Sequence, residues 1–268
     1  MIFGVEKGVS RCSVDDFQIN GSRYFFYPVS FVQIYIYMIL SDTLRKIESR
    51  VKSLFAQEGT GHDWHHINRV RNTALKIAKA ENSAKASTSE DAKAEGVDLF
   101  VVELAALLHD IADHKFHNHD LTVGPERARE IILEETNDTE LAEWIATIVS
   151  EISFKGAGVE TPVSSLEAAV VQDADRLDAL GAIGIARAFA YGGHKNRPIY
   201  DPEIESSLHD NFDDYAKKGT HTINHFYEKL LLLKDRMHTD TGRKMAEGRH
   251  CFMEEYLERF YDEWKGKK

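Results

Sequence analysis

Apolar residues recur every three or four positions along most of the chain after Met38, which is the period of an amphipathic helix. Ser41 or Asp42 is a candidate N-cap for the first such helix, at residues 41–57. The same period predicts further helices at residues 64–80, 97–113, 128–136, 139–153, 165–193, 223–237 and 246–264. We find no internal repeat and no strand-like alternation of useful length. The predicted fold class is therefore all-α, with a single helical bundle.

Three segments of this part of the chain differ from a simple amphipathic helix. Residues 97–113 are apolar on nearly every side until His109, as expected for a central helix that its neighbours bury. Residues 81–96 are rich in Ser, Ala and charge, which predicts a solvated loop or a loose helix end. Residues 192–220 carry Gly, Asn and Pro, which predicts a long loop with little regular structure.

The amino terminus differs from the rest of the chain. Residues 24–40 (YFFYPVSFVQIYIYMIL) are strongly apolar, but they contain Pro28 and Gln33 and are short of the about 20 apolar residues that a bilayer span needs. The segment also lacks the basic region and the small-residue cleavage site of a signal peptide. We interpret residues 1–37 as an N-terminal extension from a misread upstream start codon, with residues 38–268 as the domain. A membrane or partner anchor and an added structural element are the alternatives.

The charge of the chain limits its partners. With 33 basic and 44 acidic side chains the formal net charge is −11, which provides no global field for a nucleic acid polymer or an anionic membrane. Cys12 and Cys251 form neither a CxxC nor a zinc spacing, which indicates a reducing compartment. We therefore expect a cytoplasmic protein without stable membrane association. A homodimer remains open.

The stretch GHDWHHINRV at residues 61–70 offers several histidines as metal ligands. Asp63 directly precedes the helical period and suits an N-cap, and His65 lies about 100° around the axis from His66. His66 belongs instead to a stripe that continues into apolar residues and therefore faces the core; its members are His62, His66, Val70, Thr73 and Ile77. His66 is thus the better ligand candidate.

A second pair, His109 and Asp110, ends the most apolar of the predicted helices. Burying a carboxylate beside an imidazole is costly unless a partner compensates the charge. A metal ion is such a partner. The alternative is a hydrogen-bonded core histidine beside a capping aspartate.

Three carboxylates, Asp173, Asp175 and Asp178, interrupt an otherwise apolar run. Asp175 and Asp178 are three residues apart and share a helix face, and their apolar flanks predict that the helix is mostly buried. At least one of them then needs a cation partner. One histidine, the His-Asp pair and one aspartate make an N2O2 set that suits Mn²⁺, Mg²⁺, Fe²⁺ or Zn²⁺. The absence of thiolates disfavours a structural zinc.

The order of these motifs resembles the HD-domain superfamily of metal-dependent phosphohydrolases, an all-helical fold. The segments HDWHHINRV, ELAALLHDIADHKF and VVQDADRLDALGAIGIARAFAYGG are together similar to the stand-alone HD hydrolases that include nucleoside-triphosphate pyrophosphohydrolases. The resemblance covers residues 41–264. It implies one divalent metal ion, with Mn²⁺ or Mg²⁺ expected first, bound by His66, His109, Asp110 and Asp175.

Members of the superfamily with two or more metals use extra histidines between the HD pair and the final aspartate. Here His114, His117 and His119 all follow the pair in one loop, which favours a single metal. Asp113 corresponds to the acidic position that follows the HD pair in related hydrolases. We interpret it as the general base for the attacking water, with an ion pair or a helix cap as the alternative.

Phosphate charge requires cations near the metal. Lys115 is the candidate beside the HD pair, and the substrate-binding candidates are Lys155, His194, Lys195 and Arg197. Solvated side chains are the alternative for each. We expect Arg69 and Arg176 to pair with buried carboxylates and so to hold the metal ligands in place.

These inferences favour an enzyme that hydrolyses a nucleotide or another small phosphate ester. The family resemblance implies conversion of a (deoxy)nucleoside triphosphate to the monophosphate and pyrophosphate. A non-catalytic nucleotide sensor that keeps the ligands is one alternative. A di-iron oxygenase is another, and the placement of the histidines disfavours it because that reaction needs two metals.

Overall fold

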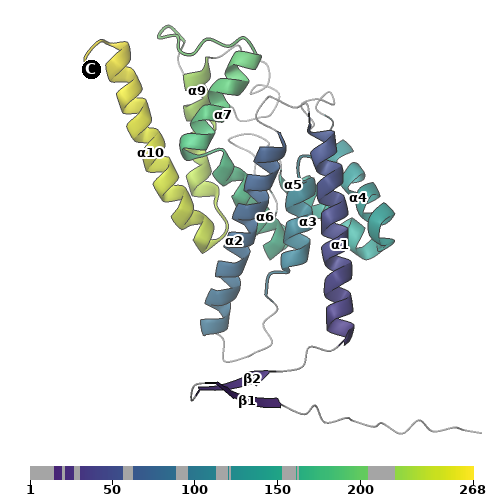
Figure 1. Ribbon diagram of the computed structural model, residues 1–268. Helices are drawn as coiled ribbons and strands as arrows, with labels where there is room; N and C mark the ends of the chain where they lie inside the picture. The colour runs from purple at the N-terminus through teal and green to yellow at the C-terminus, as the bar shows by residue number, and fades with distance from the viewer. Residues whose placement is uncertain are drawn as a thin grey trace, which may run out of the picture. The chain divides into compact units, whose positions relative to one another are not determined.

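The computed structural model describes residues 15–19, 22–26, 31–56, 63–88, 96–112, 120, 122–152, 161, 163–204 and 221–268. The chain divides into two compact units, Met1–Asp42 and Thr43–Lys268 (Figure 1). The predicted boundary at residue 38 and the interpretation of residues 1–37 remain predictions.

The first unit contains a hairpin that the sequence analysis did not predict. Strands β1 (Asp15–Ile19) and β2 (Ser22–Phe26) pair antiparallel, with Phe17 opposite Tyr24. Asn-Gly separates the two strands in the sequence, and this dipeptide is the strongest short-range signal for a two-residue hairpin. The sequence analysis found no strand-like alternation of useful length and therefore missed this hairpin, whereas the all-α prediction holds for the second unit.

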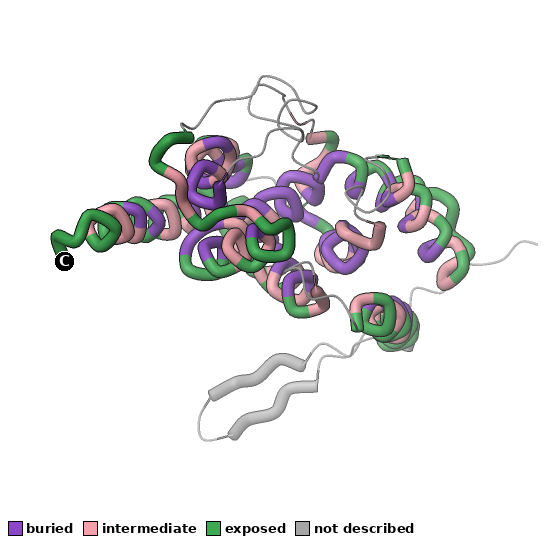
Figure 2. Tube along the Cα trace, turned by 90° about the horizontal axis from the view of Figure 1, so that it is seen from above, coloured by how far each residue is buried: buried purple, intermediate pink, exposed green. Residues whose placement is uncertain are grey.

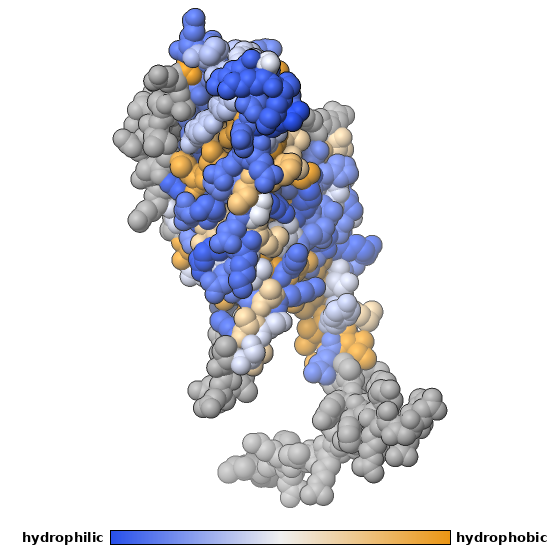
Figure 3. Space-filling model, turned by 90° about the vertical axis from the view of Figure 1, so that its left-hand side faces the viewer, coloured by the Kyte–Doolittle hydropathy of each residue, from blue (hydrophilic) through white to orange (hydrophobic). Residues whose placement is uncertain are grey.

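Helix α1 (Phe31–Leu54) begins well before Ser41, where the sequence analysis placed its N-cap. Its early residues expose their apolar side chains, and orange surface gathers there in Figure 3; the exposed residues are Val32, Ile34, Tyr35, Ile36, Tyr37, Met38 and Ile39. Among the described residues, no helix is long and apolar enough to cross a membrane. Within the second unit, Ile47 and Val51 of α1 are fully buried.

The second unit is built from helices throughout its described residues, and the predicted all-α fold is confirmed. They are α2 (Trp64–Thr88), α3 (Leu99–Leu108), α4 (Val123–Thr136), α5 (Thr139–Ile152), α6 (Leu166–Asp178), α7 (Gly181–His194), α9 (Thr222–Glu228), the 3₁₀ helix η2 (Leu230–Arg236) and α10 (Asp240–Trp264). The expected helix at 223–237 is thus two short pieces, α9 and η2.

The core lies where α2, α3 and α6 pack against one another. The side chain of Asp98 caps α3 by accepting N–H bonds from Phe100 and Val101, and nearly every later residue of α3 is buried, as its all-round apolar pattern predicts. Viewed from above, the buried residues of these helices turn toward one another while α10 keeps an exposed outer face (Figure 2). This arrangement brings the ends of α2, α3 and α6 together.

Helices α6 and α7 replace the single helix that the sequence predicts at 165–193. The break falls at Ala179 and Leu180, and Gly181 has a positive φ of 72°. A glycine adopts this left-handed conformation without the steric penalty that other residues incur. Because of this break, α6 ends at Asp178. Helix α7 then takes a new direction, so that its side chains can reach the carboxylate of Asp178.

We expect Gly181→Ala to lower the free energy of unfolding by about 1–2 kcal/mol, because an L-residue in the left-handed region carries that penalty. The new Cβ would also lie 3.1 Å from Cγ of Arg249, which must shift. Urea unfolding measures the change. The matched control is Gly193→Ala in α7, where the new Cβ would meet no atom from elsewhere in the described part of the chain within 4 Å. Equal stabilities of the two variants would contradict this explanation of the break.

Candidate metal centre

The first turn of α2 places His66 in the core. Oδ1 of Asp63 accepts the backbone N–H of His66 at 2.9 Å, so the predicted N-cap is confirmed. The His66 side chain is fully buried, whereas His65 is exposed, as the helical stripe predicts. His62 lies outside the described residues.

His109 follows the last residue of α3 and is also buried. Its Nδ1 lies 2.8 Å from the carbonyl oxygen of Ala106, to which it donates its proton. A main-chain bond of this kind fixes the ring orientation and leaves the lone pair on Nε2. Nδ1 of His109 is therefore bonded to its own helix, and Nε2 points away from it.

Three side chains from the end of α3 and from α6 lie around Nε2 of His66. Nε2 of His66 lies 3.2 Å from Nε2 of His109, 3.3 Å from Oδ2 of Asp110 and 3.5 Å from Oδ1 of Asp175. Nε2 of His109 lies 3.7 Å from the same oxygen of Asp110 and 3.8 Å from that of Asp175. Ligand atoms of His66, His109 and Asp175 all lie within 4.8 Å of one another. The structure thus brings together the four residues named from the sequence as metal ligands.

The hydrogen bonds around the two imidazoles test whether a cation fits this point. Nδ1 of His66 donates to Oδ2 of Asp178 at 2.7 Å, as Nδ1 of His109 does to a carbonyl, so in the neutral form of each ring the lone pair is on Nε2. Two lone pairs 3.2 Å apart beside two carboxylates repel unless a proton or a cation lies between them. Burial disfavours the protonated form of His66, but hydrogen bonds with Asp110 and Asp178 raise its pKa above the ordinary value. Imidazole and carboxylate donors in this arrangement suit a divalent cation.

Asp178 differs from Asp175 although both lie near the end of α6. The Asp175 side chain is 31% exposed and faces the metal centre, whereas that of Asp178 is 6% exposed. Burial acts to raise the pKa of Asp178, but hydrogen bonds from His66 and Arg69 hold it well below its usual range. Asp178 is therefore an ionised carboxylate that orients His66 from behind.

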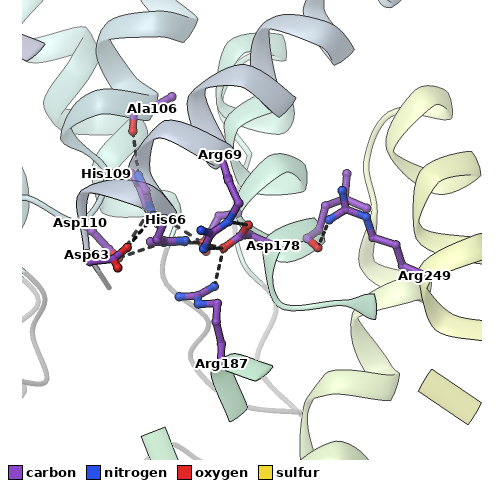
Figure 4. Close-up of polar contacts among 11 residues, drawn as sticks. Asp63, His66, Arg69, Ala106, His109, Asp110, Asp178, Arg187 and Arg249 are labelled. Carbon is purple, nitrogen blue, oxygen red and sulfur yellow. Dashed lines mark hydrogen bonds and ion pairs between the residues drawn. The ribbon is translucent and has the colours of Figure 1, made fainter. Parts of the chain in front are cut away.

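Two arginines contact Asp178 (Figure 4). Arg69 donates from Nε at 2.7 Å and from Nη2 at 3.0 Å, and Arg187 of α7 donates from Nη1 at 3.0 Å. The expectation that a buried aspartate needs a cation partner and that Arg69 supplies one agrees with these contacts. The sequence analysis did not find Arg187, because its place depends on the break between α6 and α7.

Within the described residues, Arg176 does not form the ion pair with a buried carboxylate that the sequence analysis predicted. Its Nη1 donates to the carbonyl oxygen of Arg236 and lies 3.1 Å from Nε2 of His238. Burial lowers the pKa of Arg176 to about 10. The expected partner is wrong because Arg176 lies off the face that carries Asp175 and Asp178, and it joins α6 to the segment before α10 instead.

The predicted substrate residues fall into two groups. Asp113, Lys115 and Lys155, together with the histidines considered for a second metal, lie outside the described residues. The others lie at the end of α7, where Nζ of Lys195 is 5.6 Å and Cζ of Arg197 is 5.8 Å from the centre of the Tyr191 ring. His194 also lies beside that ring, at 6.4 Å between ring centres. Their roles remain predictions.

Residues 63–180 match the family model of the HD domain. YpgQ of Bacillus subtilis strain 168 is 37% identical over 214 residues, which cover 79% of this chain and 89% of YpgQ. The crystal structure of YpgQ in complex with ADP aligns with a TM-score of 0.61 at 34% identity, covering 84% of this chain and 97% of that one.

Two further crystal structures are similar over nearly their whole length. An HD-superfamily hydrolase from Bacillus thuringiensis is 37% identical with a TM-score of 0.61, and a protein from Lactobacillus plantarum is 33% identical with a TM-score of 0.68. Each alignment covers 84% of this chain and 98% of the other. The similarity therefore includes the helices that carry the candidate metal centre.

Proposed function

The chain belongs to the HD domain family, and on that premise we propose that it is a metal-dependent phosphohydrolase that cleaves (deoxy)nucleoside triphosphates to monophosphates and pyrophosphate. The observation that carries the proposal is that Nε2 of His66 lies close to Nε2 of His109 and to a carboxylate oxygen each of Asp110 and Asp175. YpgQ has been crystallised with ADP, which supports a nucleotide as the substrate class.

His66, His109, Asp110 and Asp175 would hold the cation, with Mn²⁺ or Mg²⁺ expected first. When bound, a divalent cation polarises a phosphoryl oxygen and increases the acidity of water near neutral pH. Asp178 keeps the proton of His66 on Nδ1, so that Nε2 stays available as a ligand. Asp110 and Asp175 are partly exposed, which leaves the centre open on the side where a substrate must enter.

Further residues are assigned from the sequence. Asp113 would position and deprotonate the attacking water, with Lys115 beside it to balance phosphate charge. Lys155, His194, Lys195 and Arg197 would bind the remaining phosphates or the nucleoside.

A release screen tests this function. The full chain is incubated with Mn²⁺ or Mg²⁺ and a panel of nucleoside mono-, di- and triphosphates, and pyrophosphate and orthophosphate are measured separately. We expect pyrophosphate from triphosphates. Orthophosphate from monophosphates would instead indicate a nucleotidase, and a tightly bound metal without any release would indicate a nucleotide sensor.

A further inference from the structure

We propose that Arg69 binds a phosphate group of the substrate with the edge of its guanidinium group that Asp178 leaves uncovered. This inference rests on the proposed function, because it assumes a phosphorylated ligand at the metal centre. It gives Arg69 a second role beside its ion pair with Asp178.

The hydrogen bonds of Arg69 use only part of its donor set. A guanidinium group has five N–H donors, and Asp178 accepts one from Nε and one from Nη2. Within the described part of the chain, Nη1 of Arg69 has no acceptor. The side chain is 34% exposed although its carboxylate partner is buried. The edge formed by Nη1 and the second N–H of Nη2 is therefore available to a ligand.

Arg71 on the same helix shows what a wholly structural arginine looks like here. Its Nε and Nη2 donate to Oε1 of Glu103, and its Nη1 donates to Oε2 of Glu48 at 3.1 Å. All three of its nitrogens have carboxylate partners inside the protein. Among the described residues, no second carboxylate accepts a hydrogen bond from Arg69, although the charge of Asp63 also acts on it.

The position of Arg69 suits a phosphate at the metal centre. Arg69 follows His66 by three residues, so the two side chains lie on the same face of α2, and both contact Asp178 (Figure 4). Only the His66 ring and the Asp178 carboxylate separate the guanidinium group from the point where the two Nε2 atoms meet. The proposal places a substrate phosphate next to the one at the metal against this edge.

The donor geometry of Arg69 also suits an anion. Asp178 contacts both Arg69 and Arg187, and it uses only part of the Arg69 donor set. Two parallel N–H donors on a planar group match two oxygens of a phosphate, which makes a bidentate pair. Lysine offers one charged nitrogen and cannot reproduce this pair while it also holds Asp178.

The first test compares Arg69→Lys with the control Arg71→Lys in the full chain. Calorimetry measures the binding of Mn²⁺ alone and then of inorganic pyrophosphate in the presence of Mg²⁺. Pyrophosphate binding is compared at a Mg²⁺ concentration that saturates each protein, and we expect Arg69→Lys to bind pyrophosphate about tenfold more weakly than the unchanged protein, since it loses a charge-assisted hydrogen bond. Arg71→Lys should bind pyrophosphate normally. Equal pyrophosphate affinities for the two variants would overturn the proposal.

A second test uses the unchanged protein and does not depend on how the variants fold. An arginine-specific dicarbonyl reagent is applied with and without pyrophosphate, and the modified arginines are mapped by mass spectrometry. Pyrophosphate should protect Arg69 severalfold, whereas the modification of Arg71 should not change. An unchanged modification rate at Arg69 under saturating pyrophosphate would refute the contact.

The two proposals fail in different ways. Pyrophosphate binding that depends on Arg69, without hydrolysis of any nucleotide, would support the phosphate contact and refute the enzymatic function. Hydrolysis with unprotected Arg69 would refute the contact alone.

Discussion

Asp175→Ala is expected to abolish tight binding of Mn²⁺ and, with it, all hydrolysis of nucleotides. The variant loses a carboxylate oxygen that lies 3.5 Å from Nε2 of His66 and 3.8 Å from Nε2 of His109. Because loss of a residue that only supports a ligand costs about 10- to 100-fold in metal affinity, loss of a ligand should exceed 100-fold. Calorimetric titration with Mn²⁺ measures the effect, and His66→Ala should give the same result.

The control for this prediction is His65→Ala, which removes an exposed imidazole next to His66. This variant should bind Mn²⁺ as the unchanged protein does, and His62→Ala should retain most of the binding. If His62→Ala lost as much affinity as His66→Ala, the assignment of the first ligand would be wrong.

Asp178→Asn is expected to have the second largest effect. The change removes the charge that pairs with Arg69 and Arg187, and it replaces a carboxylate that only accepts from Nδ1 of His66 by an amide that can also present an N–H donor to it. Removal of one charged partner from a buried ion pair should lower the free energy of unfolding by about 3–5 kcal/mol, because the other charge is left without compensation. Loss of the oriented His66 should weaken Mn²⁺ binding by about 10- to 100-fold. Urea unfolding and Mn²⁺ titration measure the two effects separately.

Asp173→Asn is the matched control, because Asp173 is equally buried on the same helix and lies away from the metal centre. Its carboxylate accepts backbone N–H bonds from His238 and Thr239 before α10, so its loss should lower stability. Mn²⁺ affinity of the folded variant should not change. A destabilised Asp178→Asn variant with normal Mn²⁺ affinity would show that Asp178 does not orient His66.

The sequence predicts the metal centre better than its surroundings, for physical reasons. His66 could be chosen over His65 as the ligand because successive side chains of a helix point about 100° apart. One of the two therefore faces the core and the other faces solvent. The HD pair and Asp175 interrupt apolar helices, where uncompensated carboxylates are unstable. These arguments use spacing within one helix and need no knowledge of tertiary structure.

Contacts between elements were harder to predict. The two aspartates of α6 share a face, and spacing alone did not show that Asp175 faces the metal centre while Asp178 lies behind His66. Arg187 reaches Asp178 only because the chain breaks near Gly181, and the helical period of the sequence continues through this point. The hairpin near the amino terminus was missed because its strands are short, although Asn-Gly marks its turn.

The central claim is that one divalent cation binds where α2, α3 and α6 meet. The most direct test is an anomalous difference map from crystals of the full chain grown with Mn²⁺ and recorded near the manganese absorption edge. We predict one strong peak about 2.0–2.5 Å from Nε2 of His66, Nε2 of His109 and a carboxylate oxygen each of Asp110 and Asp175. No peak at this point would contradict the claim, and two peaks there would instead favour a two-metal centre.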